Sequence, residues 1–367
     1  MLNDSFAEEL FGEDITTRSS PFEKYGFHRN PFPGHEEEFS EFIYGQDEAK
    51  QVFLERFKQF HRDRNVNTLL IVADHRVGKT NFLRYYHHRL EKMLQSKRIS
   101  RTEAPFLPIY TRAYEYDFFF IYQQIIEKLP EDILIGLFDT LTENPLSQEF
   151  PDTDLSRALK KAGEDRASSE FDQEERISLF RRWLRGGYRS LNKLEREDLG
   201  VRENITNSPV GARFLRDLIE IMRERNILNG LVFFFDEFER LVGAGLSRAQ
   251  KDRYLNDIRN FISDFQRGAF FTFAITPAGL AVLQRNNPAI PSRLGTQLQL
   301  RNLESEKEAL EFTQIYIDHF RQEKKKDILI RDQISNVFLR EKERDQKVRQ
   351  GNFLARLREE VEKNVFQ

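Results

Sequence analysis

The amino-acid sequence predicts an α/β fold built on a parallel sheet. A short continuous apolar run extends from Thr68 to Ala73 and has the pattern of a strand that is buried on both faces. A loop that contains Gly78 follows this run, and Phe82, Tyr86 and Leu90 then recur at helical spacing. Because strands and helices continue to alternate along the chain, we expect the strands to be parallel and the helices to cover both faces of the sheet.

Five strands are expected in total. The four that follow the first are expected at residues 106–110, 231–235, 270–275 and 297–300. Before the first strand, apolar side chains at positions 49, 53, 57 and 60 share one face of a helix, and a further helix is expected over residues 118–129. The predicted core is therefore a parallel five-stranded sheet with helices between its strands.

The chain divides into four segments by composition. Residues 1–21 are polar and aperiodic, which is typical of a disordered tail. The α/β core is expected over residues 22–302. It is interrupted by a helical insertion at residues 130–209, because that stretch is far longer than an ordinary α/β connection. Residues 303–367 are helical by composition and predict a small all-α C-terminal domain.

Composition excludes several classes of protein. The 367 residues include no cysteine, so disulfide scaffolds and thiolate metal sites are excluded. No stretch approaches the roughly 18 to 20 apolar residues that span a membrane, and the acidic N-terminus does not resemble a secretion signal. A cytoplasmic location is therefore expected. The net charge of −3 gives no global electrostatic attraction to nucleic acid, so any DNA contact must be local.

A phosphate-binding loop is predicted between the first strand and the helix that follows it. Gly78 allows the backbone to approach a phosphate closely, Lys79 can reach the β- and γ-phosphates, and the Thr80 hydroxyl can bind Mg²⁺. Ala73 stands where the pattern usually has glycine, and we expect it to be tolerated if its φ is negative. The residues predicted to contact the nucleotide here are Asp74, His75, Arg76, Val77, Gly78, Lys79, Thr80 and Asn81.

A second motif supports the same site. The buried strand that begins at Leu231 ends in Asp236 and Glu237, the pattern of a Walker B strand. Asp236 would join Thr80 in the Mg²⁺ site, and Glu237 would act as the general base that polarises the attacking water. The two motifs together predict a protein that binds ATP and Mg²⁺.

Six motifs follow one another along the chain. They are Asn30-Pro31-Phe32, Tyr44-Gly45-Gln46-Asp47-Glu48, the phosphate loop, Asp236-Glu237, Phe273-Ala-Ile-Thr276-Pro277 and Ser292-Arg293-Leu294. Their order resembles that of AAA+ ATPases, most of all the branch that holds replication-initiator, secretion-associated and transposition-regulator ATPases. The resemblance covers roughly residues 22–365 and implies a P-loop NTPase fold in which the C-terminal helices form a lid.

The resemblance implies roles for further residues. Thr276 is similar to sensor 1, a polar side chain that reads the γ-phosphate, and Arg293 is similar to an arginine finger that completes a neighbouring subunit's site. Phe32 and Tyr44 are similar in place to the elements that frame the adenine. The sensor 2 position in Gly351-Asn-Phe-Leu has no arginine, and Arg356 is only a displaced candidate.

Three further segments form a local pattern. They are Phe180-Arg-Arg-Trp-Leu-Arg-Gly-Gly-Tyr188, Leu199-Gly-Val201 and the run from Asn229 to Arg240. This pattern resembles the ATP-binding proteins of bacterial phage-exclusion (BREX-type) systems, which implies a role in antiviral defence. The AAA+ resemblance implies an ATPase that assembles into an oligomer, a ring or filament, and remodels or regulates DNA or a DNA-processing protein. The alternative is a nucleotide-gated assembly switch with little or no hydrolysis, which Ala73 and the missing sensor 2 arginine favour.

The insertion contains one segment that admits two interpretations. From Arg181 to Arg189 it places cations beside Trp183 and Tyr188, a combination that can contact phosphates and stack on bases. The same pattern is expected of a solvated helix face that Trp183 anchors to the core, and this interpretation is favoured.

Overall fold

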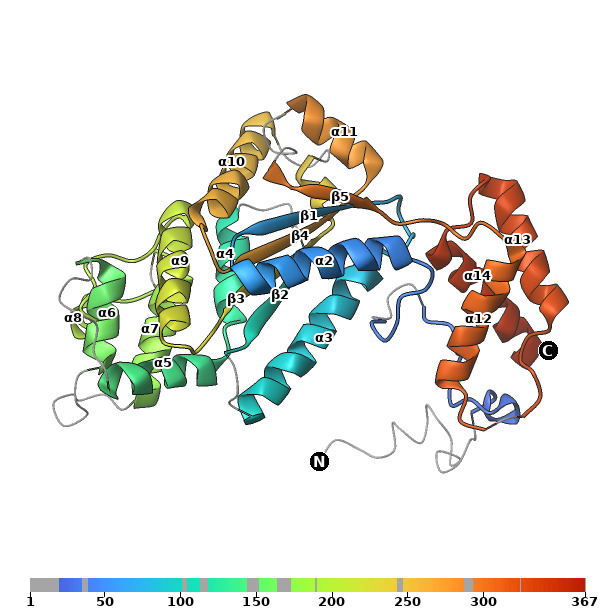
Figure 1. Cartoon of the computed structure of the whole chain (residues 1–367), viewed down its shortest axis with the longest axis horizontal. Coiled ribbons are helices and arrows are strands. Elements are labelled where there is room, and N and C mark those ends of the chain that lie inside the picture. Colours follow the sequence, from blue (N-terminus) through green and yellow to red (C-terminus); the bar gives the residue numbers. More distant parts are fainter. Residues whose placement is uncertain are drawn as a thin grey trace, which may run out of the picture. The chain divides into compact units, whose positions relative to one another are not determined.

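A single five-stranded sheet forms the centre of the larger part of the chain. The computed structural model describes residues 20–34, 39–100, 104–112, 118–143, 152–163, 173–188, 190–242, 247–286, 293–323 and 325–366. The strand order is β2-β3-β4-β1-β5, and every neighbouring pair is parallel (Figure 1). The strands lie within two residues of their predicted ends, which confirms the predicted sheet. They are β1 (Asn67–Val72), β2 (Phe106–Arg112), β3 (Gly230–Asp236), β4 (Ala269–Ile275) and β5 (Thr296–Gln299).

Phenylalanine stacking joins the two central strands. Every residue of β3 and β4 is buried. The parallel register places Phe233 opposite Phe271 and Phe235 opposite Phe273. The paired rings are almost parallel, with centroids 4.9 and 5.0 Å apart. Such cross-strand aromatic pairs stabilise a sheet beyond the area they bury, which accounts for part of the phenylalanine content of the chain.

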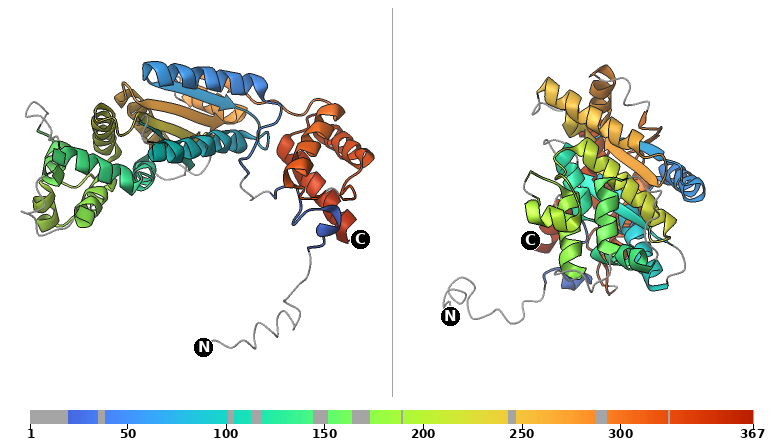
Figure 2. Two further views of the ribbon diagram at one scale, coloured as in Figure 1. Left: turned by 60° about the horizontal axis from the view of Figure 1, so that its bottom comes forward. Right: turned by 90° about the vertical axis from the view of Figure 1, so that its left-hand side faces the viewer.

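Helices cover both faces of the sheet, as predicted (Figure 2). On one face, Phe53 of α2 (Asp47–Asp63) stacks on Tyr86 of α3 (Lys79–Ser100) at 3.8 Å and contacts Phe270 of β4 edge-on. On the other face, Phe261 of α10 (Arg248–Asp264) packs against Phe233 of β3. The alternation of side chains along a strand explains the two sets, since neighbours in sequence point to opposite faces.

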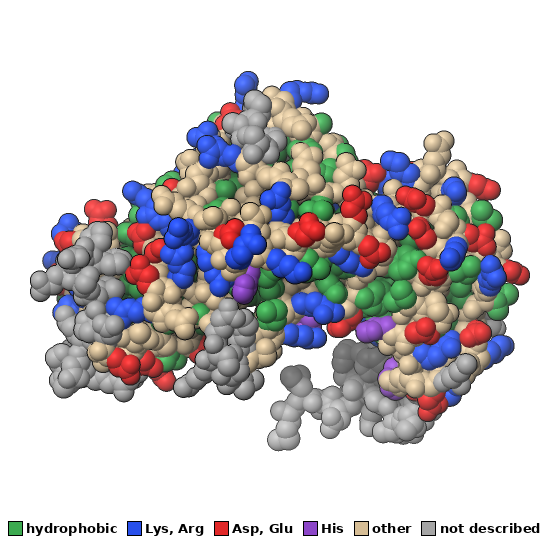
Figure 3. Space-filling view, in the orientation of Figure 1, with side chains coloured by type: hydrophobic (Ala, Val, Ile, Leu, Met, Phe, Trp, Pro, Cys, Tyr) green, Lys and Arg blue, Asp and Glu red, His purple; other side chains and the backbone are tan. Residues whose placement is uncertain are grey.

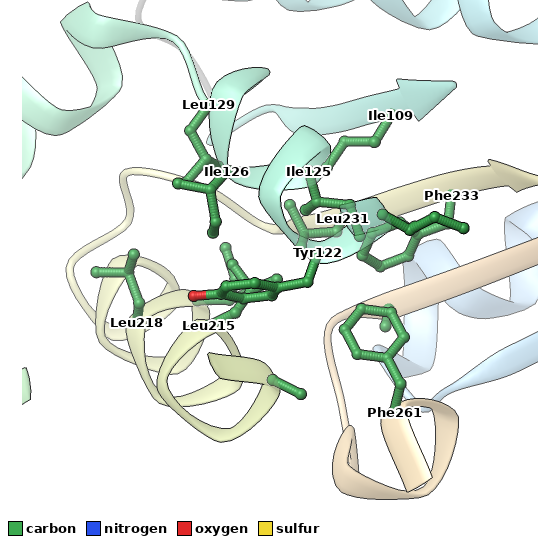
Figure 4. Packing of buried hydrophobic residues seen from close by; sticks show 14 of the residues in the cluster. Ile109, Tyr122, Ile125, Ile126, Leu129, Leu215, Leu218, Leu231, Phe233 and Phe261 are labelled. Carbon is green, nitrogen blue, oxygen red and sulfur yellow. The ribbon is translucent and has the colours of Figure 1, made fainter. Parts of the chain in front are cut away.

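The region between β2 and β3 is helical, and its helices continue the hydrophobic core of the sheet. Tyr122 lies fully buried among Leu215, Leu218 and Ile126, as Figure 4 shows. Gly211 is required here, because a Cβ at this position would lie 2.5 Å from the Tyr122 ring. The helices of this region are α4 (Phe118–Glu127), α5 (Glu131–Glu143), α6 (Asp154–Gly163), α7 (Gln173–Arg185), α8 (Lys193–Leu199) and α9 (Ser208–Glu224).

The position of Trp183 on α7 distinguishes the two interpretations of residues 181–189. Its side chain is fully buried, and its indole nitrogen donates a hydrogen bond to the Glu203 carbonyl at 3.0 Å. It therefore anchors α7 to the core, whereas Tyr188, three residues after the helix, is 86% exposed. Arg189 lies outside the described residues.

The chain separates into two compact units. The helical unit comprises the described residues of Met1–Phe39 together with Arg76–Gly78 and Arg301–Gln367. The sheet unit comprises Ser40–His75 and Lys79–Leu300. Residues 22–34 and Phe39, which were predicted to lie in the α/β core, belong to the helical unit. The tail predicted at residues 1–21 lies, except for Ser20 and Pro21, outside the described residues.

Contacts with the last helix hold the N-terminal segment in the helical unit. The Tyr25 hydroxyl donates to the Asn364 carbonyl at 3.1 Å, and the Asn30 amide donates to the Arg358 carbonyl at 3.3 Å. Except for the short 3₁₀ turn Glu23–Tyr25, the segment before Pro33 has no regular structure, as its prolines and aromatics predict. The helices of this unit are α12 (Glu306–Phe320), α13 (Arg331–Asp345) and α14 (Gln350–Phe366).

The surface is highly charged and its signs are mixed. Basic and acidic side chains alternate over the face seen in Figure 3, which agrees with the small net charge. Within the part of the chain that the structure describes, no helix combines the length and apolar character needed to cross a bilayer.

The buried side chain of His87 is expected to make the stability of the fold depend on pH. His87 of α3 packs edge-on against Phe234 and Tyr110, and its side chain is only 19% exposed. Burial lowers the pKa of His87 to about 4, and positive neighbours add to the effect. The charged and titratable groups that face it are Glu91 at 3.4 Å, His88, Arg84, Lys128 and Tyr110.

We expect the folded state to lose stability as the pH falls from about 6.5 toward 4. In this window the unfolded chain takes up a proton at His87 and the folded chain does not, which costs about 2–3 kcal/mol. His87→Gln should remove most of this dependence in urea unfolding at pH 7 and pH 5, whereas His88→Gln should keep it. Equal pH dependence in wild type and His87→Gln would contradict the assignment.

Candidate nucleotide-binding site

The predicted phosphate loop joins β1 to the first turn of α3. Arg76 and Gly78 have positive φ angles of 64° and 108°. At Gly78 a side chain would be strained by this backbone conformation, although the nearest atom to an added Cβ, the Gln350 side-chain oxygen, is 3.4 Å away. Ala73 does not have a positive φ, so alanine fits where the usual pattern has glycine. The loop therefore has the backbone conformation that an anion-binding turn requires at a helix N-terminus.

Lys79 spans the inside of this loop. Its side-chain nitrogen donates to the carbonyls of Ala73 at 2.9 Å and Asp74 at 3.1 Å, and the residue is 7% exposed. Burial lowers the pKa of Lys79, and the negative charges of Glu239 and Asp236 oppose that shift. A buried cation among carboxylates at the start of a helix is suited to hold phosphate oxygens.

Thr80 and Asp236 come together from different parts of the chain. The Thr80 hydroxyl donates to Oδ2 of Asp236 at 2.8 Å, and the Glu237 backbone N–H donates to Oδ1 at 2.9 Å. Asp236 is 1% exposed at the carboxyl end of β3. The predicted pair is thus adjacent, although 156 positions separate its members.

The donor set fits Mg²⁺. Mg²⁺ prefers oxygen ligands and is usually held by one or two carboxylates together with substrate phosphates and water. Thr80 and Asp236 supply a hydroxyl and a carboxylate beside the phosphate loop. Within the described ranges there is no cluster of three or more histidine or acidic side chains that would form a metal cage. The site therefore suits a metal ion that arrives with a nucleotide.

Glu237 lies on the turn directly after β3. It has a positive φ of 55°, an unusual conformation for a residue that is not glycine. Its Oε2 lies 2.5 Å from Nε of Arg240, an ion pair rather than an aligned hydrogen bond, since this oxygen accepts none within the described chain. Strained residues gather at functional sites, and this one directly follows Asp236 in the sequence.

Thr276 lies at the same carboxyl edge of the sheet as the phosphate loop and Asp236, whereas Arg293 precedes β5. The Thr276 oxygen accepts from the Gly279 N–H at 3.1 Å and so caps α11 (Pro277–Asn286). The residue lies at the end of β4, between β1 and β3 in the sheet, and is 5% exposed. Arg293 is exposed, and its guanidinium donates to the Ser263 hydroxyl at 2.5 Å. Ser292, in the same motif, lies outside the described residues.

The two residues predicted to frame the adenine belong to different units. Phe32 is fully buried in the helical unit, where its ring lies 6.2 Å from that of Tyr316. Tyr44 belongs to the sheet unit and is half-buried. Its segment is tied to the phosphate loop, because the Asn81 amide donates to the Phe42 carbonyl at 3.1 Å.

Within the helical unit, the tip of the phosphate loop meets the start of α14. The Gly351 N–H donates to the Arg76 carbonyl at 2.8 Å, and the Arg76 guanidinium donates to Asn352 at 3.0 Å. Arg356, the displaced sensor 2 candidate, is bound to Glu341 at 3.2 Å and to Glu359 at 2.8 Å. Its charge is therefore neutralised by carboxylates within the same unit.

Sequence reasoning missed two residues of the site. Glu239, on the 3₁₀ helix Phe238–Val242, contributes the largest stabilising negative charge at Lys79. Its Oε1 lies 3.9 Å from Nδ1 of His75, and its position three residues after Asp236 was the available signal. The Tyr110 hydroxyl donates to Oδ2 of Asp236 at 2.7 Å. The apolar run that predicts β2 does not indicate that the Tyr110 side chain reaches a residue of the neighbouring strand.

Several solved structures are similar to the chain. The ORC2 protein of Aeropyrum pernix in its ADP form is 10% identical, with a TM-score of 0.48, and the match covers 91% of this chain and 71% of the ORC2 chain. The same protein in ADPNP–ADP complexes is 10% identical, with a TM-score of 0.49, and the match covers 92% of this chain and 71% of that chain. The Aeropyrum pernix ORC1 protein in complex with DNA is 14% identical, with a TM-score of 0.46, and the match covers 88% of this chain and 61% of the ORC1 chain. No curated protein sequence matches the chain.

A protein-family model matches residues 144–366, which is more than half of the chain. Its description is "BREX system ATP-binding protein BrxC/D". The matched range includes the Asp236-Glu237 motif, Thr276, Arg293 and α14, and the phosphate loop precedes it. The chain therefore belongs to the family of BREX system ATP-binding proteins BrxC/D.

Proposed function

We propose that the protein is a Mg²⁺-dependent ATPase of the AAA+ type. The observation that carries the proposal is the 2.8 Å hydrogen bond between Thr80 and Asp236, which unites the phosphate loop with the acidic end of β3. Lys79 directly precedes Thr80, and Glu237 directly follows Asp236 in the sequence. A cation for the phosphates, a metal site and a carboxylate base are the parts that phosphoryl transfer to water requires.

Each residue has a distinct task in the proposed reaction. The backbone N–H groups of the loop and Lys79 bind the β- and γ-phosphates. Mg²⁺ held near Thr80 and Asp236 would neutralise charge on the phosphate oxygens. Glu237 accepts a hydrogen bond from the attacking water and orients it, and Thr276 reads the γ-phosphate from the end of β4. The products are ADP and inorganic phosphate.

Phosphate release tests hydrolysis directly. Wild type should release phosphate from ATP in Mg²⁺ and not in EDTA, and turnover should be measured alone and with added DNA. Absence of turnover in every condition, with ATP binding intact, would favour the second candidate function. That candidate is a nucleotide-gated assembly switch, and the pairing of Glu237 with Arg240 favours it because the base would first have to leave an ion pair.

We also infer that the protein acts as a homo-oligomer, a ring or filament, in which Arg293 completes a neighbour's site. The support is that Arg293 is exposed and its side chain contacts Ser263. An arginine inserted in trans stabilises charge in the transition state, and its contribution reaches about 10³-fold or more in other NTPases.

Arg293→Ala should lower turnover at least about 10-fold, since a trans arginine is worth that and more. Lys79→Ala should also be inactive alone. An equal mixture of the two should recover turnover, because mixed oligomers contain interfaces with both an intact site and an intact arginine. Ser263→Ala and Arg285→Ala serve as controls, since the first removes the contact within the chain and the second a nearby exposed arginine. A mixture no more active than its components would contradict the trans arrangement.

The proposed partner is DNA or a DNA-processing protein in antiviral defence, in a cytoplasmic setting. Membership in a BREX system family supports the defence role. The end of α7 supports a contact surface, because Tyr188 beyond it is 86% exposed, although Arg182 and Arg185 are each paired with a glutamate, Glu195 and Glu127. ATP turnover that rises with added DNA would support DNA as the partner.

A further inference from the structure

The Walker B carboxylate has a third donor that comes from the neighbouring strand. Tyr110 lies on β2, in register with Phe234 of β3. Its hydroxyl donates to Oδ2 of Asp236 at 2.7 Å. The same oxygen accepts from Thr80 at 2.8 Å, while Oδ1 accepts from the Glu237 N–H at 2.9 Å. Because both carboxylate oxygens accept hydrogen bonds from fixed donors, rotation of the Asp236 carboxylate about its Cβ–Cγ bond is restricted.

Tyr110 is itself held in place by α3. The Arg84 guanidinium lies 5.1 Å from the centre of the Tyr110 ring and hydrogen-bonds its hydroxyl. His87, one turn further along the helix, meets the same ring edge-on at 5.9 Å. A chain of contacts therefore runs from Arg84 through Tyr110 to Asp236, and it starts on the helix that carries Thr80.

The Tyr110 hydroxyl acts as a hydrogen-bond donor toward Asp236. A carboxylate only accepts hydrogen bonds, so the 2.7 Å contact places the phenolic hydrogen between the two oxygens. A hydrogen bond donated to a buried carboxylate such as that of Asp236 is charge-assisted and stronger than a neutral hydrogen bond.

We propose that Tyr110, supported by Arg84, is a positioning residue that orients Asp236 for the metal ion that accompanies the nucleotide. The inference rests on the proposed function, since it concerns the metal of the same site. Groups that orient a metal-binding carboxylate through hydrogen bonds typically change metal affinity by about 10- to 100-fold when removed. Tyr110 touches neither nucleotide nor water in this role. Its effect passes through Asp236 alone.

Binding of a nucleotide analogue with and without Mg²⁺ measures metal affinity separately from nucleotide affinity. Tyr110→Phe removes one oxygen and leaves the ring between β2 and α3. A fluorescent ADP analogue should bind this variant and wild type equally in EDTA. On titration with Mg²⁺, the concentration that gives half of the metal-dependent gain in affinity should rise about 10-fold in the variant. Arg84→Gln should give a smaller rise, because the phenol still donates.

Tyr86→Phe is the matched control. Tyr86 lies on the same helix and is 7% exposed, and its ring stacks on Phe53, away from the carboxylates. Its variant should match wild type in EDTA and in Mg²⁺. If Tyr110→Phe binds the analogue normally in EDTA and its Mg²⁺ titration also matches wild type, the inference is wrong.

Two other outcomes of these titrations would contradict either the role of Tyr110 or the proposed function. A parallel loss of affinity in EDTA and Mg²⁺ would overturn the inference, because it would show a general effect on the site. Wild type that binds no analogue, or binds it without any metal dependence, would instead overturn the proposed function. The two failures are therefore distinguishable in one set of titrations.

Discussion

Replacement of Glu237 by glutamine is expected to lower ATP turnover about 10²- to 10⁴-fold, the usual contribution of a general base. Glutamine has nearly the same shape but does not accept a proton from water. The side chain follows Asp236 on a turn with φ of 55°, and its only described charged partner within 4.0 Å is Arg240. ATP affinity should persist, because Lys79, Thr80 and the loop backbone are unchanged.

Phosphate release and binding of a fluorescent ATP analogue, measured on the same preparation, check this prediction. Glu343→Gln, an exposed glutamate on α13, is the control and should keep full turnover. Turnover of Glu237→Gln within about twofold of wild type would contradict the role of base, since a lost base should cost at least about 10²-fold.

Much of the sheet could be predicted because its signals are local. Strands buried on both faces read as continuous apolar runs, and β3 and β4 are of this kind. The phosphate loop and the Asp236-Glu237 pair could be predicted for the same reason. Each is a short pattern at the carboxyl end of such a run. The 2.8 Å contact between Thr80 and Asp236 follows from those two placements and from the sheet order.

Other features depend on long-range packing that a local pattern does not contain. Membership of residues 22–34 in the helical unit follows from contacts with α14, more than 300 positions away. The contribution of Tyr110 depends on which strand lies next to β3. The pairing of Arg356 with Glu341 depends on the packing of α13 against α14. Residues of this kind become visible only when the elements are assembled.

Lys79→Ala has the second large expected effect, a loss of nucleotide affinity of at least about 100-fold. Each hydrogen bond from a charged group contributes about 1.5–3 kcal/mol, and two phosphate contacts would therefore account for such a loss. The variant should fold, because the lysine is costly to bury and alanine favours the start of α3. Glu239 and Asp236 would then face the phosphates without their cation, which weakens binding further.

Lys92→Ala is the control for this variant, since Lys92 is an exposed lysine on the same helix. It should bind ATP as wild type does. A thermal unfolding curve without nucleotide should show that Lys79→Ala is folded, so that weak binding reports on the site.

The most direct test of the account is calorimetric titration of ATP into wild type and Lys79→Ala in the presence of Mg²⁺. We expect ATP to bind saturably at one site per chain in wild type and in Lys92→Ala, and we expect this binding to be lost in Lys79→Ala. Equal binding by wild type and a folded Lys79→Ala variant, or no binding by wild type, would contradict the assignment of the nucleotide site to this loop.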